Sequence, residues 1–405
     1  MTLDDRMARL AALCVTAGLD LRIGQELIVS APIEAQPFVG HVAAAAYRSG
    51  APLVTCLYED PFLIRARLDH GSDASLDRAA GWLSDGVVKA YEDGAARLFV
   101  YGPYPDLLTG VAPERIGRLH AAAAAASAAE AAFTADLRVN WCAVPYVTGS
   151  WARTVYPAVP VAEAVGQLWA DVLDVLRVSA PDPAAAWRDH LYALEARCRQ
   201  LQALDLGALR FTGGGTDLTV GLADGHRWVG GRSRAGNGAL PVCNFPAEEV
   251  FTSPHRDRAD GRLVASRPLA LGGAVVDGLV VTFRDGVAKR IEARSGREML
   301  EGLLAGDDGA RRLGEVALVP CSSPVARKGV LFYNTLLDEN AASHVAFGQS
   351  YAACLEAGRG GADAGANASA LHIDCMLGHG AMDVDGIMRS GRRRPIMRDG
   401  EFLLD

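Results

Sequence analysis

The stretch QELIVSAPIEAQPFVGHVAAAAYRSGAPLVTCLY, residues 25–58, reads as a strand, a helix and a second strand in that order. Its two ends, 25–31 and 52–58, are short runs of β-branched and other apolar residues, as is typical of strands. Between them, residues 34–50 place apolar side chains at helical spacing and finish with Gly50, as a helix often does. A strand, a helix and a strand in succession predict parallel pairing of the two strands.

The same alternation continues through the first half of the chain. Strand-like runs recur at 96–102 and 136–144, and a second helical stretch occupies 75–94. The tract 120–133 is almost entirely alanine, which favours a helix, and we expect it to pack closely on the surface. These patterns predict an α/β N-terminal domain, residues 1–204, with a mostly parallel sheet covered by helices.

The character of the sequence changes near residue 200. Residues 179–204 begin with a proline-rich turn and continue as an amphipathic helix, with Asp182 as its expected N-cap. Beyond them the chain is rich in strands and turns, and in 279–294 the tripeptide RDG joins two alternating strands as a hairpin. A chain of 405 residues also exceeds the size of a single core. We therefore expect a second, strand-rich α+β domain, residues 205–405.

Composition and charge exclude several classes of protein. Half of the residues are hydrophobic and the net charge is −8, which argues against a nucleic-acid partner because such binding needs clustered positive charge. The basic run 389–395 is expected to be a solvated loop. The first fifteen residues carry acidic groups where a signal peptide would be basic, and no window is apolar enough to span a membrane. We expect a cytoplasmic protein without a membrane partner.

The eight cysteines are scattered singly along the chain. No C-x-x-C pair is present, so neither a disulfide framework nor a zinc site built from cysteine is predicted. Most of the cysteines are expected to be small buried hydrophobic residues.

The segment ALHIDCMLGHG, residues 370–380, places His372 and Asp374 two apart in an apolar run. On a strand these two side chains share a face, while Ile373 and Cys375 point to the other side. Such a pair can act chemically as one unit. It can equally be a satisfied hydrogen bond within a core, because buried polar groups are normally paired.

Further polar residues occur in apolar surroundings elsewhere in the second half. They are Glu248 and Glu249 in 244–254, Glu315 in 311–320, and Asp338, Glu339, His344 and Tyr351 in 333–351. Several buried carboxylates and imidazoles in one domain must either pair with one another or hold metal. Carboxylate and imidazole ligands without thiolates suit Zn²⁺, Co²⁺, Mn²⁺ or Fe²⁺.

These segments resemble the thermophilic-type aminopeptidase family of dinuclear metallopeptidases. The resemblance is carried, in the family's order, by VNWCAVPYVTGSWARTVYP (139–157), FTGGGTDLTVGL (211–222), RWVGG (227–231), NFPAEEVFTSPHR (244–256), GEVALVP (314–320), LFYNTLLDENAASHVAFGQSY (331–351), LHIDCMLG (371–378) and MDVDGI (382–387). It covers essentially the whole chain. It departs from the family in residues 356–370, which are shorter and richer in Gly and Ala, so substrate preference does not follow from the likeness.

The resemblance implies a set of metal ligands. Residue by residue, these are Glu249, Glu315, His344, Tyr351, His372 and Asp374. It also implies two divalent ions, Zn²⁺, Co²⁺ or Mn²⁺, and removal of the N-terminal residue from short peptides. A homodimer, in which the N-terminal domains enclose an interior chamber and limit access to short peptides, is implied as well.

Chemical roles follow from the residue types. Two cations a few ångströms apart need a bridging carboxylate, so Glu249 or Glu315 is expected to bridge, and a water between the metals would attack the scissile carbonyl. Tyr351 could ligate a metal or donate a hydrogen bond to the oxyanion. Glu248 is a candidate general base, although neighbours on a regular strand point apart. Glu339, with the preceding Asp338, is expected to support the loop that carries His344.

Two other readings compete with the aminopeptidase. His344, His372 and Asp374 alone would form the ligand set of a mononuclear Fe(II) ring-cleaving dioxygenase, but that enzyme has no need of Glu249 and Glu315. A metal-binding protein without catalysis is the second alternative. Structural metal sites are usually closed and four-coordinate, and this ligand set does not look like one.

Overall fold

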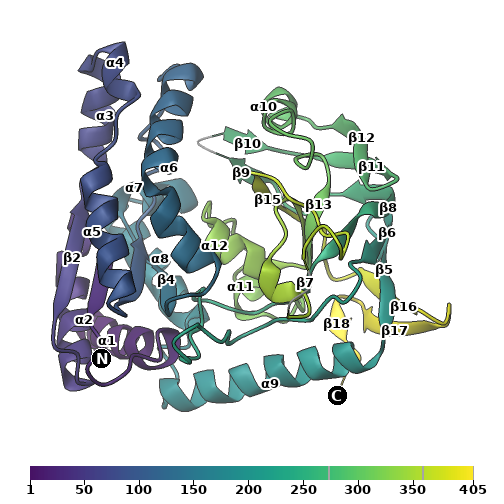
Figure 1. Cartoon of the computed structure of the whole chain (residues 1–405), viewed down its shortest axis with the longest axis horizontal. Helices are drawn as coiled ribbons and strands as arrows, with labels where there is room; N and C mark the ends of the chain where they lie inside the picture. The colour runs from purple at the N-terminus through teal and green to yellow at the C-terminus, as the bar shows by residue number, and fades with distance from the viewer. Residues whose placement is uncertain (272–273, 358–359, 405) are drawn as a thin grey trace. The chain divides into compact units, whose positions relative to one another are not determined.

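The computed structural model describes residues 1–271, 274–357 and 360–404. The chain forms two compact units, which Figure 1 follows by colour from the N-terminus to the C-terminus. The first unit contains Met1–Arg188 and Arg232–Pro246, and the second contains Asp189–Gly231 and Ala247–Asp405.

The first unit contains a four-stranded sheet in which every neighbouring pair of strands is parallel. In spatial order its strands are β2 (Val54–Glu59), β1 (Leu27–Pro32), β3 (Ala96–Tyr101) and β4 (Trp141–Pro145). They correspond to the four runs that the sequence predicted as strands, with ends displaced by a few residues. The α/β class with a parallel sheet is therefore confirmed.

Both faces of this sheet are buried. The helices of the unit are α1 (Leu3–Leu13), α2 (Gln36–Arg48), α3 (Pro61–His70), α4 (Asp73–Leu76), α5 (Gly81–Glu92), α6 (Pro113–Ala135), α7 (Gly149–Val155) and α8 (Val161–Val175). On one face, Ile28 packs with Tyr91 of α5 and Phe133 of α6. Leu27 and Val29 are also buried, and alternation turns them to the other face. Burial on both sides explains why β1 begins with three consecutive apolar residues, 27–29.

Helix α9 (Pro183–Ala203) crosses the boundary between the units, which differs from the predicted division after residue 204. The helix begins in the first unit, where Asp182 accepts a hydrogen bond from Ala185 N at 3.0 Å, as predicted for its N-cap. It then continues into the second unit, where Leu194 and Leu201 join the hydrophobic core. The boundary is misplaced because a change in composition marks the end of the helix, whereas packing changes partway along it.

Residues 232–246 also belong to the first unit, although they follow two strands of the second. They run beside β4, where Phe245 N donates to Ala143 O at 2.9 Å and Ala143 N donates to Cys243 O at 2.7 Å. These backbone hydrogen bonds join segments about a hundred residues apart, and so no local pattern in the sequence predicted them.

The second unit is rich in antiparallel strands, as predicted. Its eight-stranded sheet runs, in spatial order, β12 (Val287–Glu292), β11 (Val280–Arg284), β8 (Pro254–Val264), β6 (Thr216–Leu222), β5 (Leu206–Gly213), β16 (Asp383–Met388), β17 (Arg393–Arg398) and β18 (Glu401–Phe402). Its four-stranded sheet runs β15 (His372–Met376), β14 (His344–Gly348), β13 (Leu313–Leu318) and β7 (Val250–Thr252). The shorter elements are β9 (Leu269–Leu271), β10 (Ala274–Val276), α10 (Arg297–Leu303), α11 (Pro324–Lys328), α12 (Thr335–Asp338) and the 3₁₀ turn η3 (Glu339–Ala341).

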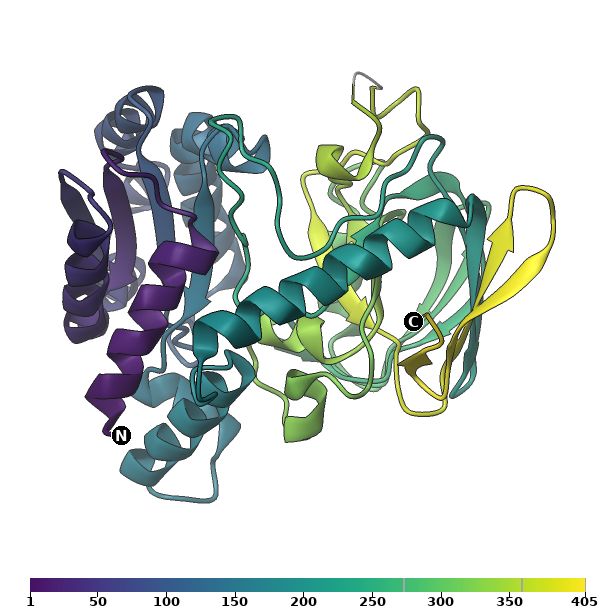
Figure 2. The same ribbon diagram turned by 90° about the horizontal axis from the view of Figure 1, so that it is seen from below.

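Two local predictions in this unit are confirmed. Strands β11 and β12 pair as the antiparallel hairpin expected in 279–294. The exposure of the basic run 389–395 is also confirmed, although only its first part is a turn: residues 393–395 begin β17, which pairs with β16 in the hairpin drawn in yellow in Figure 2.

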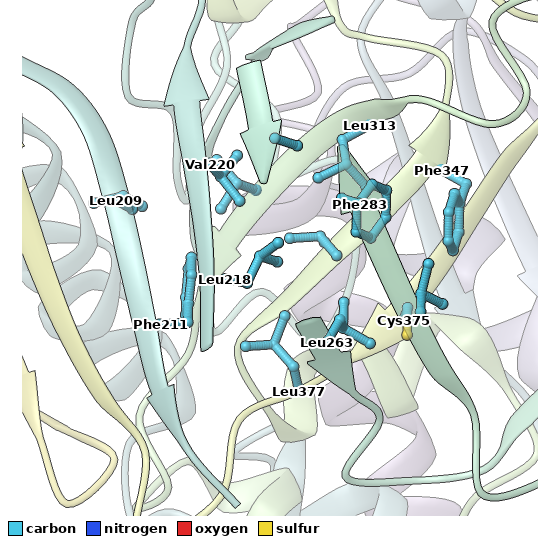
Figure 3. Close-up of a cluster of buried hydrophobic side chains, with 14 of the residues drawn as sticks. Leu209, Phe211, Leu218, Val220, Leu263, Phe283, Leu313, Phe347, Cys375 and Leu377 are labelled. Atoms are coloured by element: carbon cyan, nitrogen blue, oxygen red, sulfur yellow. The ribbon is translucent and has the colours of Figure 1, made fainter. Parts of the chain in front are cut away.

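The two large sheets of the second unit share one hydrophobic core (Figure 3). Leu218 and Leu263 enter it from the eight-stranded sheet, and Cys375 enters from the four-stranded sheet. The rings of Phe283 on β11 and Phe347 on β14 stack with their centroids 5.8 Å apart. This core fixes which face of the four-stranded sheet is turned inward.

The structure also bears on the expectations for the cysteines and for membrane-spanning helices. All eight cysteines are free, and Cys14, Cys142, Cys354 and Cys375 are buried. Across the described residues, the helices lack the length and apolar character that a membrane span requires.

Replacing a core leucine should destabilise the second unit. Leu263 is 0% exposed, so Leu263→Ala removes apolar burial and leaves a cavity, at a cost of about 2–5 kcal/mol in the free energy of unfolding. The matched control is Leu303→Ala on α10, where the side chain is 40% exposed and the expected cost is about 0.5 kcal/mol or less. Denaturation midpoints followed by circular dichroism measure both; equal midpoints would contradict the assignment of Leu263 to the core.

Candidate metal centre

Strand register places the predicted polar residues on one face of the four-stranded sheet. Ala346 of β14 lies opposite Glu315 of β13 on one side and opposite Asp374 of β15 on the other. Because side chains alternate along strands, one face carries Glu315, His344, His372 and Asp374, and the other carries Val316, Val345, Ile373 and Cys375. The second set belongs to the hydrophobic core. The small side chain of Ala346 leaves room between the two flanking carboxylates.

The imidazoles and carboxylates of this face lie within coordination range of one another. His372 Nε2 is 3.3 Å from Asp374 Oδ1 and 3.2 Å from Glu315 Oε2. His344 Nε2 is 3.2 Å from Glu249 Oε2 and 4.0 Å from Glu315 Oε1. His372 and Asp374 thus form a pair on one strand face, as their spacing predicted.

The donor atoms form two groups that share one residue. Glu249, Glu315 and His344 make one group, and Glu315, His372 and Asp374 make the other, with the donor atoms of each group within 4.8 Å of one another. One oxygen of Glu315 faces each imidazole. Glu249 and Glu315 were both expected as bridging residues, and Glu315, which belongs to both groups, is the one that would connect two cations.

Backbone carbonyl groups orient both imidazoles toward this cluster. His344 Nδ1 lies 3.0 Å from Ala342 O, and His372 Nδ1 lies 3.1 Å from Gln349 O. A carbonyl oxygen only accepts, so in each ring Nδ1 carries the proton that is donated. Nε2 is then the atom available as a ligand. This arrangement is typical of metal-binding histidines, whose second nitrogen is held by an outer acceptor.

The clustering of charges shifts the pKa values of both imidazoles upward. Burial lowers the pKa of His344, but the nearby carboxylate of Glu249 outweighs it and raises that pKa to about 10. Burial likewise opposes the effect of Asp374 and Glu315 on His372, whose pKa is raised to about 11. Protons therefore hold this cluster together when no cation does so.

The pKa values of the two carboxylates Glu315 and Asp374 shift in opposite directions. Burial, with the nearby charge of Glu249, raises the pKa of Glu315. Burial also acts to raise the pKa of Asp374, but the hydrogen bond from His372 and the charges of the two imidazoles lower it overall. Asp374 is therefore the more readily ionised of the two.

Glu339 is the residue of this site whose role the sequence did not identify. We predicted a structural role beside Asp338, but its side chain lines a small cavity of about 60 Å³ with His372 and Asp374. Burial and the charges of Glu249 and Asp374 raise the pKa of Glu339 well above its usual value. The sequence feature that could have indicated a place in the site is the position of Glu339 in the apolar stretch that leads to His344.

Asp338 has the structural role that was predicted for it. Its carboxylate accepts hydrogen bonds from Phe332 N at 2.8 Å and from Asn334 N at 3.0 Å. These bonds close the loop that precedes α12. Because Glu339 follows directly, the loop also determines where the Glu339 carboxylate enters the site.

Tyr351 lies at the edge of the cluster. Its hydroxyl is 3.3 Å from His372 Nε2, and its ring packs against those of His372 and Phe251 with centroids 5.1 and 5.9 Å away. Burial, together with the charges of Glu315 and other nearby carboxylates, raises the pKa of Tyr351. The hydroxyl thus lies beside His372, and the role of Tyr351 as a metal ligand stays a prediction.

Glu248 takes a different direction from its neighbour Glu249. It is buried, and its carboxylate lies 3.6 Å from His190 Nε2 on α9. Among the described residues, it belongs to neither of the two donor groups. The general-base role of Glu248 stays a prediction, and its ion pair with His190 connects it to the long helix α9.

The segment 356–370, in which the likeness to the family is weakest, includes residues 358 and 359, which lie outside the described residues. Its later part is anchored beside the site, because Asn367 Nδ2 donates to Gly348 O at 2.6 Å and to Gly309 O at 2.8 Å. Gly348 ends β14, so these bonds connect the segment to the strand that carries His344.

The residues present fit divalent cations. Glu249, Glu315, Glu339 and Asp374 provide four carboxylates, whose charge two divalent cations would balance. Glu249 Oε2 is buried and has no partner with hydrogen-bond geometry among the described residues, although His344 Nε2 is near. Glu249 Oε2 and His344 Nε2 face each other without a good hydrogen bond, and this arrangement suits two atoms that coordinate the same metal ion. Oxygen and imidazole donors without thiolates match Zn²⁺, Co²⁺ or Mn²⁺.

Metal binding should release protons. The pKa values of His344 and His372 are raised to about 10 and 11, so both rings hold a proton at neutral pH that must leave before Nε2 can ligate. We expect the apparent affinity for Mn²⁺ or Co²⁺ to rise with pH throughout the range below about pH 10, in which both rings still carry that proton. Titration calorimetry in two buffers of different ionisation enthalpy measures the released protons. Equal heats in both buffers, with an affinity independent of pH, would contradict this prediction.

Comparison with known proteins finds relatives along the whole length of the chain. The family model described as thermophilic metalloprotease (M29) matches residues 3–402. Aminopeptidase T of Thermus aquaticus is 46% identical over 403 residues, which cover 99% of each chain. The solved structure of wild-type AmpT from Thermus thermophilus superposes with a TM-score of 0.95 at 45% identity, covering 99% of this chain and 100% of that one.

A more distant structure bears on the dioxygenase alternative. The 2,5-dihydroxypyridine dioxygenase of Pseudomonas putida KT2440 has a TM-score of 0.55 at 12% identity, covering 100% of this chain and 99% of that one. At this identity the likeness shows a shared fold alone. The full-length family match and the close relatives, by contrast, confirm the resemblance read from the sequence motifs: this chain belongs to the M29 family of thermophilic metalloproteases.

Proposed function

We propose that this protein is a metal-dependent aminopeptidase that removes the N-terminal residue from short peptides. The observation that carries the proposal is the pair of donor groups that share Glu315, with both imidazoles turned inward by Nδ1 hydrogen bonds. Its membership of a metalloprotease family and the names of its relatives, Aminopeptidase T and AmpT, support the same activity.

Each donor group would hold one of two divalent ions. Glu249 and His344 would hold one, His372 and Asp374 the other, and Glu315 would connect them. When bound, such ions polarise a carbonyl group and make a water molecule acidic near neutral pH. A second cation beside the reacting carbonyl also offers a place for a free α-amine, which restricts the enzyme to chain ends.

The protein's own side chains would move and stabilise charge. The hydroxyl of Tyr351 is placed to donate to an oxygen that becomes negative during attack. A proton taken from the attacking water needs an acceptor, and Glu339 lines the cavity beside His372 and Asp374. Glu339 is better placed for this than Glu248, whose carboxylate faces His190.

The site does not favour the mononuclear dioxygenase. That enzyme would need His344, His372 and Asp374 around one iron, but the two imidazoles belong to different donor groups. Glu249 and Glu315 would have no role in it. A metal-binding protein without catalysis would keep the same ligands, and only an activity measurement separates it from the aminopeptidase.

Assembly and location stay predictions. The homodimer and its interior chamber are expected from the family likeness, and the cytoplasmic location is an expectation of the sequence analysis. Light scattering of the purified chain measures the first, and fractionation of the source cells measures the second.

Glu249→Gln should remove most of the metal affinity and leave the fold intact. The amide keeps the size of the side chain but loses the charge that faces His344, and we expect the hydrolysis rate to fall by about 100-fold or more. Elemental analysis of dialysed protein should find two ions per wild-type chain. Glu298→Gln is the control, because Glu298 is exposed on α10. If the Glu249 variant kept both ions and its full rate, the ligand assignment would be wrong.

A free amine on the substrate should be essential. Leucine p-nitroanilide is expected to be cleaved by metal-loaded protein, whereas N-acetyl-leucine p-nitroanilide lacks the amine and should react at least about 100-fold more slowly. Both rates are read from the absorbance of released nitroaniline. Comparable turnover of the two substrates would refute the exopeptidase, and no turnover of either would favour the alternatives.

A further inference from the structure

The first unit contains a cavity of about 630 Å³ that the metal chemistry does not use. It is lined by the carboxyl ends of β1, β2 and β3, including Pro32, Glu59 and Tyr101. The strand order β2-β1-β3-β4 changes direction between β1 and β3. In open α/β sheets, ligands bind at the carboxyl ends of the strands where the order reverses. The volume also lies within the range of small-molecule sites.

The alanine-rich tract of helix α6 keeps this cavity open. Its lining residues Ala123, Ala126, Ser127, Glu130, Ala131 and Thr134 recur at helical spacing on one face. Farther along the helix, Phe133 fills the space against Ile28 and Tyr91. The tract is helical, as predicted, but it does not pack closely throughout. Its short side chains leave the space above the ends of the strands open.

A buried arginine lies at the base of this cavity. The side chain of Arg97 on β3 is only 4% exposed. Its Nη2 donates to Ser30 Oγ at 2.7 Å and to Glu130 Oε1 at 3.1 Å. Arg97 Nε and Nη1 are buried without a hydrogen-bond partner among the described residues. Unsatisfied donors on a buried cation are costly, and Arg97 lines the cavity. A carboxylate in the cavity would accept from Nη1 and offset the buried positive charge.

The carboxylate of Glu130, which could bind a cationic group, lies beside Arg97. Glu130 accepts one hydrogen bond on each oxygen, from Arg97 and from Ser84 Oγ at 3.1 Å. Each carboxylate oxygen has a second lone pair available. Glu59 adds another carboxylate to the lining. The charged groups of the cavity therefore suit a ligand that carries both an anionic and a cationic group.

The rest of the lining is apolar. The rings of Phe99 and Tyr101 stack at 6.1 Å on the same sheet face as Arg97, and Ile64, Leu83 and Val87 also contribute. A phosphate ligand does not fit this chemistry, because the residues that follow β1, IEAQ (33–36), contain no glycine and the lining carries two carboxylates.

We propose that this cavity binds a free α-amino acid with an apolar side chain. Its carboxylate would accept from Arg97 Nη1, its ammonium would donate to Glu130, and its side chain would lie against Phe99. The inference rests on the chemistry of the cavity and not on the proposed aminopeptidase activity. If that activity is present, however, its products belong to the same class of molecule.

Titration calorimetry of the full-length protein with L-leucine tests the proposal. L-leucine should bind, whereas leucinamide, which lacks the carboxylate, and N-acetyl-leucine, which lacks the ammonium, should each bind at least about tenfold more weakly. Ala126→Phe places a ring in the cavity and should weaken L-leucine binding at least about tenfold. Ala125→Phe, on the exposed face of the same helix, is the control and should bind like the wild type.

Two further variants separate this cavity from the metal centre. Glu249→Gln should retain L-leucine binding, and Ala126→Phe should retain wild-type hydrolysis of leucine p-nitroanilide and an unchanged circular dichroism spectrum. No binding of L-leucine by the wild type, or equal binding by Ala126→Phe and Ala125→Phe, would overturn the proposal. Loss of binding in Glu249→Gln alone would assign the amino acid to the metal centre instead. The hydrolysis assay is independent, so failure of either idea is recognised separately.

Discussion

Carboxylates buried against an apolar core must be neutralised, and the second unit meets this demand on one face of a four-stranded sheet. The strands that turn Val345 and Ile373 into the core turn His344 and His372 to the opposite face. A slip of one residue in register would exchange the two sets and bury the imidazoles in the apolar core. Packing and chemistry therefore depend on the same strand pairing. The side chains of this apolar core are drawn in Figure 3, and their packing fixes the sheet face on which the donor atoms lie.

Groups outside the ligand set complete this arrangement through the backbone. The carbonyl groups of Ala342 and Gln349 fix which nitrogen of each imidazole faces the cluster. Asp338 closes the loop before η3 by accepting two backbone hydrogen bonds, and the loop brings the Glu339 carboxylate toward His372. A site of this kind is held by its supporting hydrogen bonds as much as by its ligands, and metal affinity should depend on both.

The first unit shows a related use of buried charge in a different fold. Arg97 points from a parallel strand toward Glu130 on helix α6, and the small side chains of the alanine-rich tract leave space around the pair. A close-packed interior would have excluded a charged group with unsatisfied donors. The alanines therefore do more than favour a helix, because their small side chains leave the cavity beside Arg97 and Glu130 open.

The sequence by itself determined the four parallel strands of the first unit, helices α2, α5, α6 and α9, the hairpin of β11 and β12, the shared face of His372 and Asp374, and the family to which the chain belongs, because alternation, capping and motif order are properties of nearby residues. Only the tertiary structure decided that Glu315 is common to both donor groups, that Glu339 enters the site and that Glu248 faces His190. It also assigned residues 232–246 to the first unit. The physical reason is that these features depend on pairing register and loop paths between segments far apart in the chain, which no local pattern encodes.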